Sequence, residues 1–176
     1  MIKISTYIQH TKPERCGIHM AEIGDYKGAM PTSDPNYDCD PYYMQGAIEM
    51  TVDGRHLFTK ENSSDCILSF WHTLINIVKR ISDNGDAHEY YPGSPIDIIA
   101  THRDERSLDI SLKAAHEAEA FKNITVRKRE FMIALCDGAQ RFFRLMTKIH
   151  PIGREEYERS LGELQHIRNK IFDFDH

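Results

Sequence analysis

The sequence predicts an α+β fold, in which an antiparallel sheet of about five to six strands has helices packed mainly on one face. Three observations lead to this prediction. Several short segments alternate apolar and polar residues, tight turns join neighbouring segments, and longer segments carry apolar residues at helical spacing. Because 176 residues most simply make one domain, residues 1–176 are expected to form a single unit.

The N-terminal quarter is expected to hold one strand and a long irregular segment. From Ile2 to Ile8 apolar and polar residues alternate, which is typical of a half-buried strand. Residues from about 10 to 43 contain four of the seven prolines and have no sustained periodicity. A long loop is therefore predicted, with room for one short strand near 18–23, and such loops are uncommon in compact domains unless they are functional.

The dipeptide Asp53–Gly54 predicts a β-hairpin. It separates alternating segments at 44–52 and 55–59, and a type I′ turn favours this pair because both central residues need a positive φ. The expected register places Val52 opposite Arg55 and Met50 opposite Leu57.

Three segments have the periodicity of amphipathic helices. The first begins at Asn62, a candidate N-cap, and ends at Asn84–Gly85, and the others span 127–149 and 154–171. Gly138 lies in the second helix, where glycine costs ~1 kcal/mol relative to alanine, so close approach of another backbone is expected there. Between the first two helices, strands are expected at 96–101, at 108–114 and around 121–126.

Composition and charge narrow the classes of partner. The net charge of −5 disfavours a nucleic-acid surface and suits a basic protein or a small ligand. No apolar run reaches the ~20 residues that span a bilayer, and the N-terminal segment lacks the apolar core of a secretory signal. The four scattered cysteines are typical of reduced thiols rather than of a disulfide framework. We therefore expect a cytoplasmic protein with no membrane partner and no direct nucleic-acid partner.

Residues 34–43 form the most distinctive segment, because carboxylates, tyrosines and prolines gather there. Asp34, Asn36, Asp38 and Asp40 alternate like the first ligands of an EF-hand calcium loop. The match fails further on, since Cys39 replaces the required glycine and Gln45 replaces the closing glutamate. A solvated acidic loop and a partner-binding loop are the remaining interpretations, and no metal is expected.

Other candidate chemistry is fragmentary. Cys16 and His19 have a ligand-like spacing, and His10 and Cys39 complete a zinc site only if all four converge. The sequence has no nucleophile elbow and no glycine-rich phosphate loop, so no catalytic residue and no cofactor is expected. The ten histidines are dispersed, and His72 on the flank of the first helix is the one to inspect for acid–base chemistry.

Two further clusters have a structural and a functional interpretation. Arg127–Lys128–Arg129 precedes an apolar helix and predicts a solvated strand-to-helix corner rather than a nucleic-acid site. Tyr90–Tyr91–Pro92 predicts either a second aromatic surface or packing beneath the following hairpin.

The second half of the chain has a layout that is similar to that of a known class of proteins. It consists of Trp71, the segment Tyr90-Tyr91-Pro92-Gly93-Ser94-Pro95-Ile96-Asp97-Ile98-Ile99, the charged hairpin that follows, Arg129-Glu130-Phe131-Met132-Ile133-Ala134-Leu135, and Arg141-Phe142-Phe143. This layout resembles that of small bacterial immunity proteins, which are encoded beside toxins of contact-dependent inhibition and related polymorphic systems. The resemblance extends over about half of the chain.

The resemblance implies a protein that binds one cognate toxin domain, often a basic nuclease, and blocks its active site. Acidic side chains would face the substrate-binding surface of the toxin, and tyrosines would supply buried anchors. The first partner-binding candidates are Asp34, Tyr37, Asp38, Asp40, Tyr42 and Tyr43. The second group is Glu89, Tyr90 and Tyr91.

Two other functions stay open. A small enzyme or ligand-binding domain would have a deep cleft in which a histidine meets a carboxylate or a cysteine. A structural subunit of a homo-oligomer would bury its acidic and aromatic face against a copy of itself. An immunity protein would leave that face exposed until its toxin binds.

Overall fold

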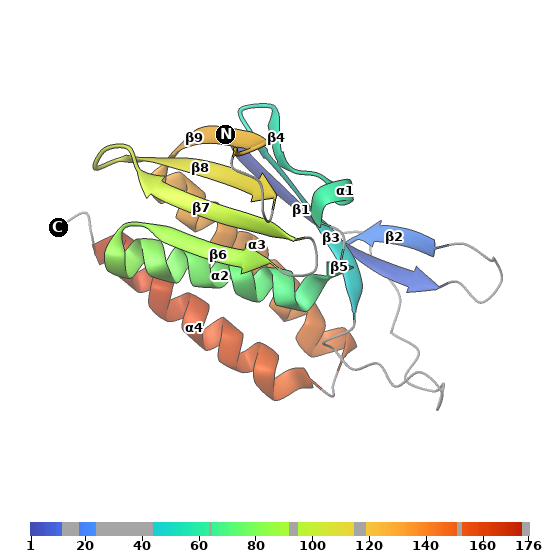
Figure 1. Cartoon of the computed structure of the whole chain (residues 1–176). Helices are drawn as coiled ribbons and strands as arrows, with labels where there is room; N and C mark the ends of the chain where they lie inside the picture. Colours follow the sequence, from blue (N-terminus) through green and yellow to red (C-terminus); the bar gives the residue numbers. More distant parts are fainter. Residues whose placement is uncertain are drawn as a thin grey trace.

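The structure of the chain, a computed structural model, describes residues 1–11, 18–23, 44–63, 65–91, 95–114, 119–150 and 153–173. Over these residues the protein is α+β, as predicted, with two antiparallel sheets (Figure 1). The first sheet contains β1 (Ile2–Thr11), β2 (Ile18–Glu22), β3 (Gln45–Val52), β4 (Arg55–Phe58) and β5 (Asp65–Cys66). The second contains β6 (Ala87–Tyr91), β7 (Ile96–His102), β8 (Ser107–Ala114) and β9 (Lys122–Arg127). The expectation of one sheet was therefore wrong.

The first sheet is built around β1 and β3. Its strand order is β2-β1-β3-β4, with β5 beside one end of β3. The short strand expected near 18–23 is β2, which pairs with the distal half of β1 inside the segment that was expected to be irregular. Antiparallel pairing with β1, the preceding strand, supplies the backbone hydrogen-bond partners of β2.

The β3–β4 hairpin turns at the predicted dipeptide. Asp53 and Gly54 have φ values of 48° and 79°, the positive values that a type I′ turn requires. Val52 lies opposite Arg55 as predicted, but Met50 lies opposite Phe58 instead of Leu57. The register shifts between Met50 and Thr51, and this irregularity allows both Leu57 and Phe58 to be buried.

The first long helix begins later than the sequence predicts. Asn62 lies in the short helix α1 (Lys60–Ser63), and α2 (Ile67–Asn84) follows only after β5. Ser63 holds this connection to β3, because its buried Oγ accepts a hydrogen bond from Ile48 N at 3.1 Å and lies 2.6 Å from Ile48 O. The tertiary contact with β3 therefore overrides the local capping signal at Asn62.

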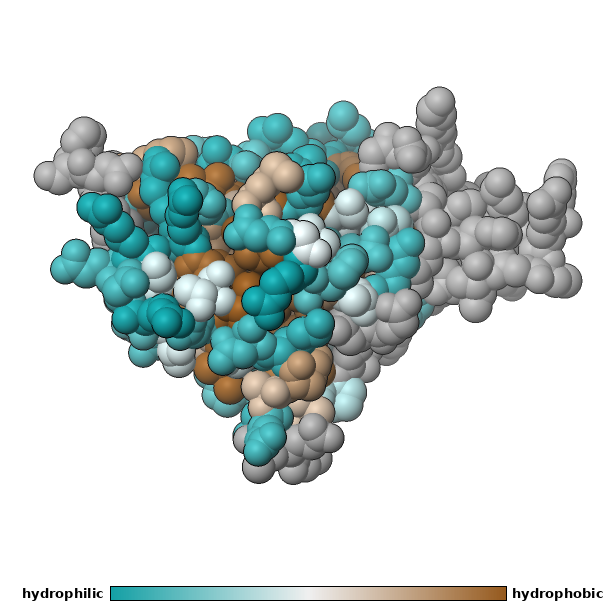
Figure 2. Space-filling model, turned by 90° about the horizontal axis from the view of Figure 1, so that it is seen from above, coloured by the Kyte–Doolittle hydropathy of each residue, from teal (hydrophilic) through white to brown (hydrophobic). Residues whose placement is uncertain are grey.

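The helices form one layer that packs against both sheets. Within the described residues, α2 contacts β3 and β6, whereas α3 (Lys128–Ile149) contacts β1 and β9. The last helix, α4 (Arg154–Asp173), packs against α3 and α2, and it lies below them in Figure 1. Seen from above, the surface is mainly hydrophilic, and hydrophobic residues are visible chiefly in hollows between hydrophilic ones (Figure 2). No helix among the described residues is long and apolar enough to cross a membrane.

Gly138 occupies the contact between α3 and its neighbours. A Cβ at this position would lie 2.6 Å from Cη2 of Trp71 and 3.4 Å from Cγ2 of Ile4. Close approach at Gly138 is therefore confirmed, but the neighbours are side chains rather than the expected backbone. The Trp71 indole fills the space that a glycine leaves, and it stacks on Phe142 with ring centroids 6.2 Å apart.

Candidate functional site

The second sheet has one face toward the helices and one face toward solvent. On the inner face Ala100, Ile110 and Ile124 lie directly opposite one another on three strands, and all three are buried. The alternate residues of β6–β9 point away from the helices and are exposed or half-buried, and we call them the outer sheet face. Its central members are His88, Tyr90, Asp97, Ile99, Asp109, Ser111 and Thr125.

The outer sheet face has an aromatic end and a polar end. At the aromatic end Tyr90 is 50% exposed and lies opposite Asp97, whose carboxylate is 2.7 Å from His88 Nε2. At the other end Thr125 Oγ1 donates a hydrogen bond to Asp109 Oδ1 at 2.6 Å. Aromatic residues are enriched in the cores of protein interfaces, and polar groups are typical of their rims.

The structure separates the second group of partner-binding candidates. Strand alternation sends Tyr90 to the outer sheet face and sends Glu89 and Tyr91 to the inner face. Tyr91 is 1% exposed and its hydroxyl donates a hydrogen bond to the Cys66 carbonyl at 3.3 Å, so it contributes to packing. The three residues therefore do not form one surface. Recognition of β6 from the sequence would have predicted this division.

Glu89 is held on the inner face by an ion pair with α2. Arg80 Nε lies 2.5 Å from Glu89 Oε1, and the Glu89 side chain is largely buried. The same oxygen has no hydrogen bond of good geometry, so the charge of Arg80 compensates electrostatically for its burial. This pairing fixes β6 to α2 and leaves Glu89 little surface to offer a partner.

The first group of candidates lies outside the described residues. This applies to Asp34, Tyr37, Asp38, Asp40, Tyr42 and Tyr43. It applies also to Cys16 and Cys39 of the zinc hypothesis, whereas His10 and His19 are opposite each other in the β1–β2 pair. Among the described residues, no three His, Cys, Asp or Glu residues gather in an arrangement that could hold a metal ion.

His72 lies beside a pocket of about 260 Å³ between α2 and α4, which Glu156, Ser160 and Glu163 also line. Its Nε2 is 3.3 Å from Ser160 Oγ, and its ring stacks on Phe143. Burial lowers the pKa of His72 from its usual value, and the charges of Glu156 and Glu163 partly oppose this effect. His72 is therefore largely neutral near pH 7.

The hydrogen-bond directions at Ser160 do not suit nucleophilic catalysis. The Ser160 hydroxyl donates to the Glu156 carbonyl at 3.1 Å, one turn earlier in α4. Because a hydroxyl has only one proton, His72 Nε2 must donate to Ser160 Oγ rather than accept from it. A general base would need the opposite direction. The pair therefore links two helices.

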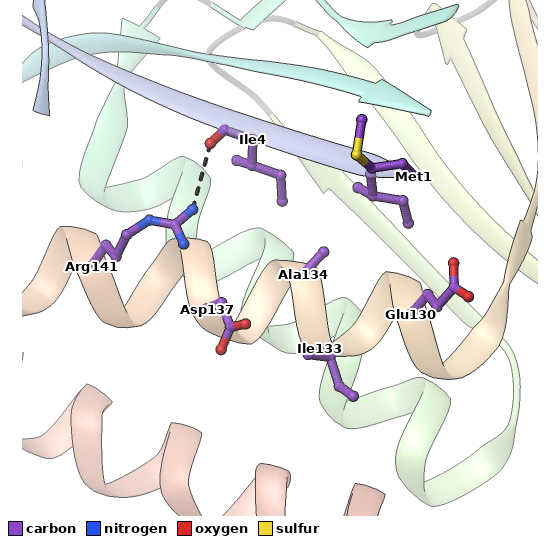
Figure 3. Close-up of a pocket in the computed structure, with 8 residues that line it drawn as sticks. Met1, Ile4, Glu130, Ile133, Ala134, Asp137 and Arg141 are labelled. Atoms are coloured by element: carbon purple, nitrogen blue, oxygen red, sulfur yellow. Dashed lines mark hydrogen bonds between the residues drawn. The ribbon is translucent and has the colours of Figure 1, made fainter. Parts of the chain in front are cut away.

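A groove lies between the first residues of β1 and one flank of α3. Its volume is about 350 Å³, and its lining consists of Met1, Ile2, Ile4, Glu130, Ile133, Ala134, Asp137 and Arg141. Figure 3 shows Arg141 reaching from α3 to the carbonyl of Ile4, where Nη2 donates a hydrogen bond at 3.5 Å. The sequence does not reveal this groove, because β1 and α3 are far apart in the chain.

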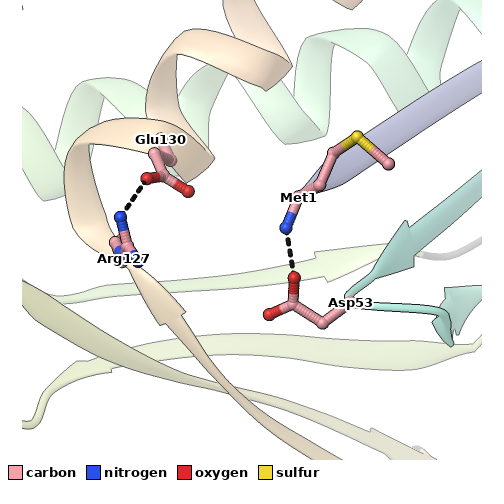
Figure 4. Close-up of polar contacts among 4 residues, drawn as sticks. All are labelled: Met1, Asp53, Arg127 and Glu130. Carbon is pink, nitrogen blue, oxygen red and sulfur yellow. Dashed lines mark hydrogen bonds and ion pairs between the residues drawn. The ribbon is translucent and has the colours of Figure 1, made fainter.

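The predicted basic corner is confirmed at the junction of β9 and α3. Arg127 Nη1 forms an ion pair with Glu130 Oε1 at 2.7 Å, and both side chains are exposed. Close by, the N-terminal amino group pairs with Asp53 of the β3–β4 turn (Figure 4). The hydrogen bond from this amino group, and its charge, lower the pKa of Asp53.

No protein-family model matches the chain, and no curated protein and no solved structure matches it. The outer sheet face agrees best with the partner-binding expectation, since it places Tyr90 in solvent beside the hydrogen-bonded side chains of His88 and Asp97.

Proposed function

We propose that the protein is a cytoplasmic immunity protein, which binds a cognate toxin domain and neutralises it. The layout from Trp71 to Phe143 that resembles immunity proteins supports the proposal. The observation that carries it is the outward position of Tyr90, which is half exposed on the sheet face that points away from the helices. No cofactor takes part in this function.

The outer sheet face has the chemistry of an interface anchor. Tyrosine combines a large apolar ring with a polar hydroxyl, and it is enriched among residues that dominate binding energy. Ile99 is diagonal to Tyr90 on the neighbouring strand and extends the apolar contact. The His88–Asp97 pair beside them supplies polar groups for the edge of an interface.

A basic partner fits the charge of the chain. With a net charge of −5, the protein would attract a basic nuclease domain over a long range and accelerate their encounter. Asp34, Asp38 and Asp40 are the acidic candidates for this contact, with Tyr37, Tyr42 and Tyr43 as neighbouring anchors. We propose that these residues contact the partner in addition to Tyr90.

Co-expression tests the proposed function. The C-terminal domain of the toxin encoded directly upstream is expressed in bacteria with and without this chain, and growth is recorded. We expect growth arrest without the chain and recovery with it. Arrest that persists in the presence of the folded chain, or an upstream gene that encodes no toxin, would exclude the immunity function.

Variants of the outer sheet face test the proposed site. Tyr90→Ala is expected to weaken toxin binding by about 30-fold, as the loss of an interface anchor does. Phe172→Ala is the matched control, because Phe172 is a similarly exposed aromatic residue on α4. Neutralisation that survives Tyr90→Ala together with asparagine at Asp34, Asp38 and Asp40 would place the interface elsewhere.

A further inference from the structure

The N-terminal half of β1 is an open strand edge within the described part of the chain. β3 pairs with Ile2–Ile8 on one side, whereas β2 begins to pair on the other side only at Tyr7. The hydrogen bond from Arg141 to the Ile4 carbonyl shows that this carbonyl points away from β3. Because backbone groups alternate in direction, those of Ile2 and Thr6 point toward the same open edge.

The groove beside this edge has an apolar floor. Ile2 and Ile4 of β1 line it together with Ile133 and Ala134 of α3. Figure 3 shows Ile4 on the strand and Ala134 on the side of α3 that faces the strand. A strand edge that faces a helix across an apolar groove is the arrangement in which extended peptides bind by strand addition. The open edge supplies main-chain hydrogen bonds, and the groove accepts every second side chain.

The charges that line the groove are compensated with one exception. Glu130 pairs with Arg127, Asp137 pairs with Arg168, and the N-terminal amino group pairs with Asp53. Arg141 has a backbone acceptor, but among the described residues no carboxylate forms an ion pair with it. At 3.5 Å its hydrogen bond to the Ile4 carbonyl is at the long limit for such bonds. Little free energy is therefore lost when Arg141 leaves this carbonyl for a stronger acceptor.

We propose that this groove binds an extended segment of a partner protein as an added strand next to β1. The segment has apolar side chains at alternate positions over Ile133 and Ala134, and it has a carboxylate that pairs with Arg141. A peptide N–H then replaces Arg141 as the donor to the Ile4 carbonyl, and the guanidinium turns to the carboxylate. The groove is separate from the outer sheet face, so its occupancy does not depend on toxin neutralisation.

A synthetic peptide tests the groove with the full chain. The probe is the capped peptide Ac-Val-Thr-Val-Thr-Glu-Thr-NH2, which alternates as required and carries one carboxylate. Amide chemical shifts are followed by NMR during titration, and we expect the largest changes at Ile2, Ile4 and Thr6. The same peptide with glutamine in place of glutamate should bind roughly tenfold more weakly, because a charge-assisted contact is lost.

Two arginine variants separate a specific contact from a general charge effect. Arg141→Ala should remove the roughly tenfold preference for glutamate over glutamine, whereas Arg144→Ala should retain it. Both arginines are exposed on α3, but Arg144 does not line the groove. Thermal unfolding of both variants confirms that each is folded.

Any one of several results would overturn the proposal. These are no binding at millimolar peptide, shifts confined to residues remote from β1, equal effects of the two arginine variants, and an unchanged affinity after N-methylation of the peptide amides. Sedimentation that shows a dimer, with β1 amides protected in the absence of peptide, would assign the edge to a second copy of the chain instead.

Discussion

At Trp71 and Gly138, a single missing methyl group determines how closely α3 can approach α2. The indole is fully buried, and its Cη2 atom would be only 2.6 Å from a Cβ atom at position 138. A rigid buried ring cannot move aside without disturbing Phe142, on which it stacks. The helix therefore retains glycine despite its low helix propensity.

Gly138→Ala should lower the free energy of unfolding by about 1–2 kcal/mol, because overpacking outweighs the gain of ~1 kcal/mol in helix propensity. Gly162→Ala is the control, since nothing lies within 4 Å of the Cβ position at this exposed site of α4. It should stabilise the protein by about 0.5–1 kcal/mol. Urea denaturation measures the change in unfolding free energy of both variants, and equal changes would contradict the packing explanation.

His72 makes stability depend on pH in a defined direction. Burial lowers its folded-state pKa below the ordinary histidine value of 6.5, which applies to the unfolded chain. Between the two values the unfolded state binds more protons, so stability decreases as the pH falls below about 6.5. Wild type should lose more stability than His72→Gln between pH 7.5 and 5.5, as measured by urea denaturation. Parallel curves for the two proteins would exclude this contribution.

At the scale of elements, Ser63 connects the start of the helical layer to the first sheet. Its hydroxyl accepts from the Ile48 amide and lies 2.7 Å from the Thr59 carbonyl, so α1, β3 and the end of β4 meet at one buried atom. Cys66 follows and pairs with Gln45 immediately before α2 starts. The beginning of α2 is therefore set by this junction.

Ser63→Ala should destabilise the protein by about 1–3 kcal/mol, because the Ile48 amide loses its acceptor in a buried place. Ser82→Ala on α2 is a matched control, since Ser82 Oγ is buried and has no hydrogen-bond partner. That substitution removes an unsatisfied group and should be neutral or stabilising by about 0.5 kcal/mol. A loss at Ser82 as large as at Ser63 would contradict this account.

At the scale of the whole molecule, two sheets share one layer of helices. The N-terminal amino group and Asp53, which form an ion pair, belong to the first sheet. The positive charge of Arg127, at the end of the second sheet, also contributes to the lowered pKa of Asp53. The outer sheet face and the groove beside β1 belong to different sheets. The two proposed binding surfaces therefore do not overlap.

The acidic character of the whole chain predicts how a basic toxin domain would associate. The association rate constant should fall steeply between 50 and 500 mM salt, because long-range attraction is screened, while the dissociation rate constant changes less. Stopped-flow fluorescence at a series of salt concentrations measures both. A rate of association that does not change with salt would remove electrostatic steering from the proposed function.

Many of the strands, helices and turns could be predicted from the sequence, because local residue patterns determine them. The Asp53–Gly54 turn, the strands β7 and β8, and the helices α3 and α4 follow from backbone preferences and apolar periodicity. Strand β6 was missed, since Ala87–Tyr91 is short and mixes charged residues with aromatic ones. With β6 missed, the separation of Tyr90 from its neighbours was missed too.

The sequence by itself determined the α+β class, the turn at Asp53–Gly54 and the acidic charge, because each depends on neighbouring residues or on composition alone. Only the tertiary structure decided that the strands divide into two sheets, that α2 starts at Ile67, and that Tyr90 faces outward while Tyr91 is buried. These outcomes depend on pairing between distant segments. The physical reason is that hydrogen-bond partners and packing neighbours are chosen by the whole chain, whereas a local pattern specifies only which faces need to be covered.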